Sequence, residues 1–161
     1  MLKSIAYIDD DTTSRLMSVY SESMEDLKSN FAGEAEMRAA YAAFLRDFIA
    51  NPRQLILAEA SGDEWVSALR AIETAQGHWF LEAVETKPEE RGKGYGKALL
   101  RHALAHLSTI GMQEVTCTIS KKNVKSQALH GKCGFAPTEE RPVNCWGELE
   151  EGTVLDRKSV V

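Results

Sequence analysis

The chain has 161 residues, 43% of them hydrophobic, so it is long enough for one sizeable core and too short for two ordinary domains. Its net charge of −5 disfavours nucleic acid as a general partner, because non-specific binding needs a basic surface. The apolar stretches are shorter than a membrane span, and the N-terminus turns acidic too soon for a signal peptide. These features predict a single cytoplasmic domain over residues 1–161 that binds neither membrane nor nucleic acid.

The first half of the chain is predicted to form a strand, two helices and a three-stranded meander. The strand is expected over Leu2 to Ile8, and Asp10 and Asp11 suit the start of the first helix. That helix would carry Leu16, Val19, Tyr20 and Met24, and the second helix Met37, Tyr41, Phe44, Leu45 and Phe48, ending at Asn51-Pro52. Turns at Ser61-Gly62-Asp63 and Gln76-Gly77 separate three strands expected to pair antiparallel: Gln54–Ala60, Trp65–Thr74 and His78–Thr86.

The second half alternates helices with strands. An amphipathic helix is expected from Gly96 to Ile110, and Gly111 would end it. A strand from 114 to 120 and a helix from 124 to 132 follow, and Phe135–Trp146 and Thr153–Val160 can supply two final strands. Antiparallel strands followed by helical crossovers predict a mixed sheet with helices on both faces.

The run R-G-K-G-Y-G-K-A-L-L at residues 91–100 is typical of a phosphate-binding loop. Glycines let the backbone approach a ligand, and the first amides of a helix are unpaired donors at the positive end of its dipole. The run is not a P-loop, because Ala98 follows Lys97, and it is not a dinucleotide loop, because Leu99 stands where a third glycine is needed. Taken alone, the segment also fits an ordinary turn between a strand and a helix.

A second motif follows about thirty residues later: Asn123-x-x-Ser126-x-x-Leu129-His130-x-x-Cys133-Gly134-Phe135. Asn123 and Ser126 suit a helix start and Gly134 suits a helix end, so a capped surface helix is the plain alternative. Together with Arg-x-x-Gly-x-Gly-x-Ala at residues 91–98, in this order and with a strand between, the motif resembles the GNAT superfamily of N-acetyltransferases. The resemblance covers about residues 55–135.

The resemblance implies an α/β fold with a mixed, mostly antiparallel sheet flanked by helices. It also implies a splayed cleft for the co-substrate acetyl-CoA between the fourth and fifth strands. The backbone of Val84 and of Thr86, which replaces the usual valine, would bind the pantetheine arm. Asn123 and Ser126 would lie along that arm, and Lys132 near the adenosine. The pyrophosphate would be bound by Arg91, Gly92, Lys93, Gly94, Tyr95 and Gly96, with Lys97 beside them.

The implied reaction is direct attack of a primary amine on the acetyl thioester in a ternary complex. An amine with a pKa of about 10.4 is protonated at neutral pH, so a base must remove a proton. Glu82 matches a position that carries a base in several members of the superfamily. Strand alternation predicts that it shares a face with Val84 and Thr86, and neighbouring apolar residues would raise its pKa. An exposed carboxylate on a strand edge is the alternative.

The leaving thiolate benefits from a proton donor, and His130 stands where many GNAT enzymes carry a tyrosine. Imidazole has a reference pKa of about 6.5, so only a minority is in the acidic form at neutral pH. His130 is therefore a candidate acid, a candidate base or a helix cap. Cys117 and Cys133 are expected to be packing residues rather than acyl acceptors. The three cysteines lack the spacing of a zinc site, and His102 and His106 lack a third ligand, so no metal is predicted.

The expected acceptor is a small-molecule or peptide amine, and no motif identifies it further. Its specificity is expected to reside in Tyr20–Ala35 and in the C-terminal strands. Five acidic residues lie in the first of these segments or directly after it: Glu22, Glu25, Asp26, Glu34 and Glu36. They form a solvated surface or attract a cationic acceptor such as a polyamine or an aminoglycoside. A non-catalytic acyl-CoA-binding module and an acyltransferase for a longer acyl-CoA remain the alternatives, and a homodimer is compatible with the family.

Overall fold

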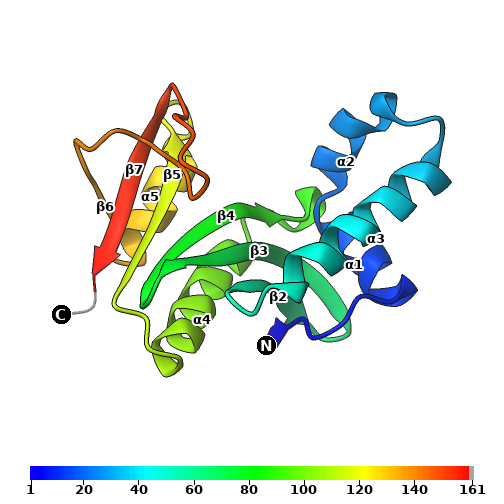
Figure 1. Ribbon diagram of the computed structural model, residues 1–161, viewed down its shortest axis with the longest axis horizontal. Helices are drawn as coiled ribbons and strands as arrows, with labels where there is room; N and C mark the ends of the chain where they lie inside the picture. Colours follow the sequence, from blue (N-terminus) through cyan, green and yellow to red (C-terminus); the bar gives the residue numbers. More distant parts are fainter. Residues whose placement is uncertain (160–161) are drawn as a thin grey trace.

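The computed structural model describes residues 1–159, and a seven-stranded sheet runs through it (Figure 1). The strand order is β1-β2-β3-β4-β5-β7-β6. The strands are β1 (Leu2–Ser4), β2 (Gln54–Ser61), β3 (Glu64–Ala75), β4 (His78–Thr86), β5 (Glu114–Ser120), β6 (Ala136–Pro137) and β7 (Thr153–Ser159). The β4–β5 pair is parallel and the other pairs are antiparallel. The predicted mixed, mostly antiparallel sheet is confirmed.

Helices cover both faces of the sheet and create two apolar cores. On one face, α4 (Tyr95–Thr109) buries Leu99, Leu100 and Leu107 against β2–β4. On the other face, α1 (Asp10–Val19) and α3 (Glu34–Ala50) pack over the same strands (Figure 1). Each fully buried leucine contributes about 1.5–3 kcal/mol, so the apolar periodicity of these helices fixes which side faces the sheet. Two shorter helices, α2 (Ser21–Leu27) and α5 (Val124–Lys132), and two single 3-10 turns, at Lys28–Asn30 and Pro88–Glu90, connect these elements.

The sheet opens between β4 and β5. These strands pair only over residues 78–80 and 114–116. Beyond this point β4 continues to Thr86 paired with β3, whereas β5 continues to Ser120 paired with β7. The two strands therefore diverge with their facing backbone edges unpaired, which confirms the predicted splay between the fourth and fifth strands.

A β-bulge lies in β4 just beyond the last residue paired with β5. Ala83 has φ +50°, in the left-handed region that non-glycine residues seldom adopt, and the register with β3 shifts between the pairs Arg70–Glu82 and Ala68–Glu85. The buried hydroxyl of Tyr20 donates a hydrogen bond of 2.8 Å to the carbonyl of Ala83. The junction of α1 and α2 thus holds the bulge from outside the sheet.

Several predicted boundaries are wrong for local reasons. The strand expected over Leu2–Ile8 ends at Ser4, and Asp9 rather than Asp10 or Asp11 caps α1 by accepting from the amide of Thr12 at 2.7 Å. The expected single first helix breaks at Tyr20, so Met24 lies on α2.

The strand expected over residues 135–146 is also wrong, because it shrinks to β6. Pro137 and Pro142 lack the N–H groups that would extend it, and the side chain of Asn144 accepts from the amides of Trp146 and Glu148 in a turn. Val160, the expected end of the last strand, lies outside the described residues.

Candidate active site

The glycine-rich loop lies at the start of α4, immediately before its first turn. Gly94 is the N-cap residue with φ +88°, and Gly92 has φ +78°. A Cβ atom at either position would meet no heavy atom of residues 1–159 within 4 Å, so the space over the loop is open. Gly94 has no side chain to bond the first amides of α4. The loop therefore presents backbone donors and the positive end of a helix to open space, which fits a phosphate group.

Gly96 serves a different purpose from the other two loop glycines. A Cβ at this position would lie 3.3 Å from Cδ2 of Leu129 and 3.4 Å from Oγ1 of Thr86. The start of α4, the end of β4 and the middle of α5 therefore meet at Gly96. Val84, also on the open edge of β4, packs against the core beneath α4. Of the residues predicted for the pantetheine arm, Thr86 thus lies next to the first turn of α4.

Two basic side chains of the loop, Arg91 and Lys93, are paired with nearby carboxylates. Arg91 contacts Glu22 of α2 at 2.8 Å and donates to the carbonyl of Thr86 at 3.2 Å, and Lys93 contacts Glu90 at 2.8 Å. Arg91 and Glu22 are 47% and 58% exposed, so their pair is weak and can exchange for a phosphate. Of the remaining predicted loop residues, Tyr95 contacts Ser61 through its hydroxyl at 3.1 Å and Lys97 is half-buried.

The residues predicted on α5 are spread along the helix. Asn123 is its N-cap, and its side-chain oxygen accepts the N–H of Ser126 at 3.0 Å. Asn123 is exposed and Ser126 is half-buried, and both lie at the N-terminal end of α5, which follows β5. Lys132 is exposed at the opposite end of α5.

Glu82 does not share a face with Val84 and Thr86, so that prediction is wrong. The bulge at Ala83 adds one residue to β4 and shifts the alternation of its side chains. Val84 packs in the core beneath α4. Ala83, by contrast, packs in the core beneath α1 and α3. The bulge therefore puts Val84 and Thr86 on the pantetheine side, whereas Glu82, which precedes it, stays on the face of Phe80, toward the helices α1–α3.

The partner of Glu82 is Arg70, a residue of β3 that sequence reasoning missed. Nε of Arg70 donates to Oε1 of Glu82 at 2.7 Å, and the two side chains are only 17% and 16% exposed. The guanidinium lies over the ring of Phe44 at 5.0 Å and beside Tyr20 at 5.9 Å. A single arginine in the otherwise apolar run A-L-R-A-I of residues 68–72 was the signal that could have identified it.

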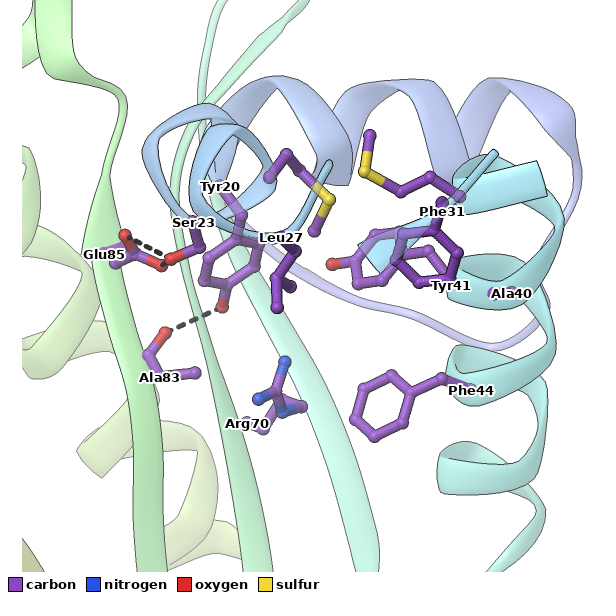
Figure 2. Close-up of a pocket in the computed structure, with 12 residues that line it drawn as sticks. Tyr20, Ser23, Leu27, Phe31, Ala40, Tyr41, Phe44, Arg70, Ala83 and Glu85 are labelled. Atoms are coloured by element: carbon purple, nitrogen blue, oxygen red, sulfur yellow. Dashed lines mark hydrogen bonds between the residues drawn. The ribbon is translucent and has the colours of Figure 1, made fainter. Parts of the chain in front are cut away.

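A pocket of about 320 Å³ lies between the sheet and the helices α1–α3 (Figure 2). Its lining is mostly apolar and comes from Tyr20, Ser23, Met24, Leu27, Phe31, Met37, Ala40, Tyr41, Phe44, Arg70, Ala83 and Glu85. Arg70 rises from the floor, and the bulge residue Ala83 forms part of the wall on the side of β4 (Figure 2). The volume of the pocket is at the lower end of the range of small-molecule pockets, and it lies beside the point where β4 and β5 diverge.

Glu85 is the second charged residue of the pocket and was also missed. Its two carboxylate oxygens accept from the hydroxyl of Ser23 at 2.9 and 3.1 Å. Burial raises the pKa of Glu85, against the opposing effects of Ser23 and the positive charges of Arg91 and Arg70. A carboxylate with a raised pKa in a pocket is a candidate for proton transfer or for binding a cation.

The five acidic residues singled out in the sequence do not line this pocket. Glu22 pairs with Arg91, Glu25 pairs with Lys28, and Glu36 accepts the N–H of Ala32. All five side chains belong to exposed residues. Glu25 and Glu34 line a different hollow between α1, α2 and α3. This arrangement favours a solvated acidic surface over a field focused on the pocket.

His130 is 2% exposed and packs edge-on against Phe135, with ring centroids 5.2 Å apart. Its Nδ1 lies 2.8 Å from the carbonyl oxygen of Ser126, so Nδ1 carries the proton. Burial lowers the pKa of His130, although this hydrogen bond and the nearby Asp156 act in the opposite direction. A neutral, buried imidazole is a poor proton donor, so the environment favours a structural role.

Replacing His130 with glutamine is expected to flatten the loss of stability on acidification. The folded protein disfavours the charged imidazole, so the unfolded chain takes up the proton first as the pH falls through about 6.5. Wild type should then lose up to about 1.4 kcal/mol of unfolding free energy per pH unit relative to the variant. Glutamine can still donate to the carbonyl of Ser126 and does not titrate.

Denaturant unfolding of both proteins from about pH 7.5 to about pH 5 measures this difference. Parallel curves would contradict a neutral buried His130. A loss of acetyl transfer in the variant of about 100-fold would instead support His130 as the acid.

None of the three cysteines offers a thiolate. Burial raises the pKa of Cys117 and Cys133, and burial together with the nearby Glu82 raises the pKa of Cys145 to about 11. Residues 1–159 contain no group of three or more metal-ligating side chains, and none of the helices in this range could cross a bilayer.

The chain resembles known acetyltransferases in sequence. The model of the Acetyltransferase (GNAT) family matches residues 16–135. The chain is 32% identical over 90 residues to mycothiol acetyltransferase of Thermobispora bispora, covering 53% of this chain and 30% of that protein. It is 35% identical over 60 residues to aminoglycoside N(6')-acetyltransferase type 1 of Stenotrophomonas maltophilia, covering 37% of this chain and 39% of that protein. The matches thus span well under half the length of these relatives.

Solved structures share the fold. The PaiA N-acetyltransferase of Thermoplasma acidophilum in complex with coenzyme A superposes with a TM-score of 0.73 at 18% identity over 99% of both chains. A chimera of the spermidine N-acetyltransferase SpeG from Vibrio cholerae and hSSAT gives 0.74 at 14% identity, over 98% of this chain and 94% of that chain. The family model, the divergence of β4 from β5 and the open glycine loop agree with one another, and the chain belongs to the GNAT family of acetyltransferases.

Proposed function

We propose that this chain, as one domain over residues 1–161, transfers the acetyl group of acetyl-CoA to a primary amine within a ternary complex. The observation that carries the proposal is the open glycine loop of α4 beside the divergent edges of β4 and β5. The loop amides, with Arg91, Lys93 and Lys97, would bind the pyrophosphate. The unpaired edge of β4 at Val84 and Thr86 would bind the pantetheine arm. Asn123, Ser126 and Lys132 would contact the co-substrate from α5.

Glu82 is the proposed base, and Arg70 its positioning residue. The ammonium gives one proton to Glu82, directly or through water, and the nitrogen lone pair attacks the thioester carbonyl carbon. The C–N bond forms and the C–S bond breaks, the nitrogen loses its second proton and the thiolate takes one up. The products are the amide, the thiol of coenzyme A and one proton released by Glu82. The guanidinium of Arg70, fixed by the ion pair and the surrounding rings, holds the carboxylate in place.

Direct attack is favoured over an acyl-enzyme by the state of the cysteines. Each of the three thiols has a raised pKa and remains protonated at neutral pH. A protonated thiol is a weak nucleophile, since the thiolate is the reactive form. The amine is therefore the proposed nucleophile, and no covalent intermediate on the protein is required.

Acetyl-CoA is expected to raise the melting temperature of the protein and to be consumed when an amine is added. A ligand at about 100 times its Kd stabilises the folded state by about 2.7 kcal/mol, which corresponds to about 5–10 °C for a chain of this size. Thermal denaturation measures binding, and release of the coenzyme A thiol with a panel of amines measures transfer. Pantetheine, which lacks the pyrophosphate, is the control and should give a smaller shift.

The same assay distinguishes the alternatives. Stabilisation without thiol release from any amine would indicate an acyl-CoA-binding module. Faster release from a longer acyl-CoA would indicate another acyltransferase. No stabilisation by any acyl-CoA would overturn the proposal.

A further inference from the structure

The pocket of Figure 2 combines an apolar interior with one cationic and one anionic side chain. We propose that its ligand, the acceptor of the reaction, is an α-amino acid with a large apolar side chain. This inference rests on the proposed function, because it assigns the acceptor of the same site. In it, Arg70 receives the carboxylate, Glu85 receives the ammonium group, and the apolar residues receive the side chain.

Arg70 has donors that no other side chain uses. Its Nε is bonded to Glu82, whereas its terminal nitrogens make no hydrogen bond within residues 1–159. The guanidinium is directed into the pocket (Figure 2). Partly buried donors on a charged group require a partner, and the forked guanidinium matches a carboxylate. The aromatic rings around Arg70 limit competition from water.

Glu85 supplies the complementary charge on the adjoining wall. It stands two residues beyond Ala83 on β4, next to the edge that diverges from β5. Ser23 holds its carboxylate, and Arg70 is close enough to act on its charge. An ammonium bound at Glu85 would therefore lie between the pocket and the proposed thioester position, with a carboxylate in reach of Arg70. A zwitterion satisfies both groups, whereas a simple amine leaves the terminal nitrogens of the guanidinium without an acceptor.

The rest of the lining determines the side chain that fits. The walls away from the sheet are formed by Leu27, Phe31, Tyr41 and Phe44, together with Met24 and Met37. A polycation such as spermidine would place its distant ammonium groups against these apolar side chains at a large desolvation cost. The exposed acidic residues of α2 and α3 do not reach this lining. An aromatic or branched aliphatic side chain matches it.

The test compares acceptors in the thiol-release assay with the full chain. L-phenylalanine and L-leucine should exceed L-alanine in kcat/KM by about 10-fold or more, from burial of their side chains. L-phenylalanine should exceed phenethylamine, which lacks only the carboxylate, by about 10- to 100-fold. Spermidine should be the poorest acceptor. Equal or better use of phenethylamine, or a preference for spermidine, would overturn the inference while leaving acetyl transfer intact.

Variants of Arg70 separate carboxylate binding from positioning of Glu82. In Arg70→Met the ratio of kcat/KM for phenylalanine to kcat/KM for phenethylamine should fall to about 1. Arg70→Lys should keep part of this preference for phenylalanine. If Arg70 only positions Glu82, both acceptors slow equally and the ratio persists, which contradicts the proposal.

Arg15→Met is the matched control for these variants. Arg15 also bonds a carboxylate through Nε, that of Asp11 at 2.8 Å, and lies over an aromatic ring, that of Trp65 at 5.4 Å, but it is outside the pocket. In Arg15→Met the ratio of the kcat/KM values for phenylalanine and phenethylamine should equal that of wild type. Thermal stabilisation by acetyl-CoA shows that each variant is folded. If acetyl-CoA binds and no amine of any class releases thiol, this inference and the proposed transfer both fail.

Discussion

Replacing Gly94 with valine is expected to reduce acetyl-CoA affinity by at least about 100-fold. The Cβ of residue 94 would enter the open space over the first turn of α4, where the proposed phosphate would lie. Hydrogen bonds to charged groups contribute about 1.5–3 kcal/mol each, so losing two of them accounts for this effect. Isothermal titration with acetyl-CoA measures the affinity directly.

Gly111→Val is the control for backbone strain. Gly111 follows the other end of the same helix with φ +92°, and a Cβ there also meets no heavy atom of the described residues within 4 Å. Each valine forces a left-handed conformation at a cost of about 1–2 kcal/mol, so both variants should lose similar stability. Only Gly94→Val should lose affinity. Unchanged binding by a folded Gly94→Val protein would remove the basis for placing the phosphates at this loop.

The features that could be predicted from the sequence depend on local chemistry. The strand over residues 114–120 and the helix over residues 124–132 have the predicted bounds, because capping and stop residues mark the helix at both ends. The spacing of Gly92 and Gly94 likewise predicted an open loop before a helix. The opening between β4 and β5 followed from the family resemblance, because no local pattern specifies where two strands separate.

The features that were missed depend on contacts between distant segments. Nothing in the run L-E-A-V-E-T marks Ala83 as a bulge, since alanine has no preference for the left-handed region. The bulge is held by Tyr20, which is 63 positions away. Because alternation was assumed to continue through β4, Glu82 was placed on the wrong face. The pocket forms only when β3, β4 and the helices α1–α3 are assembled. The positions of Arg70 and Glu85 in its lining therefore could not be predicted from local sequence.

Replacing Glu82 with glutamine is expected to lower kcat by about 100-fold or more near neutral pH, with acetyl-CoA affinity unchanged. The amide oxygen of glutamine can still accept from Nε of Arg70, so the positioning contact is kept and the base is lost. Activity should recover in part at high pH, where solvent deprotonates the amine without help. Steady-state kinetics from about pH 6 to about pH 10 test this pattern.

Two further carboxamide variants make the assignment of Glu82 specific. Glu140 also bonds an arginine, Arg157, but lies on an exposed surface away from the pocket, so Glu140→Gln should behave as wild type. Glu85, whose pKa is raised by burial, is the rival base. If Glu85 only binds the ammonium group, Glu85→Gln raises the acceptor KM and leaves the shape of the pH profile of kcat unchanged.

The opposite result would assign the role of base to Glu85 instead of Glu82. In that case Glu85→Gln would lose kcat and recover it at high pH, whereas Glu82→Gln would keep the wild-type profile. The bulge at Ala83 makes this comparison necessary, because it places both carboxylates on the side of the pocket and leaves Val84 and Thr86 to the co-substrate.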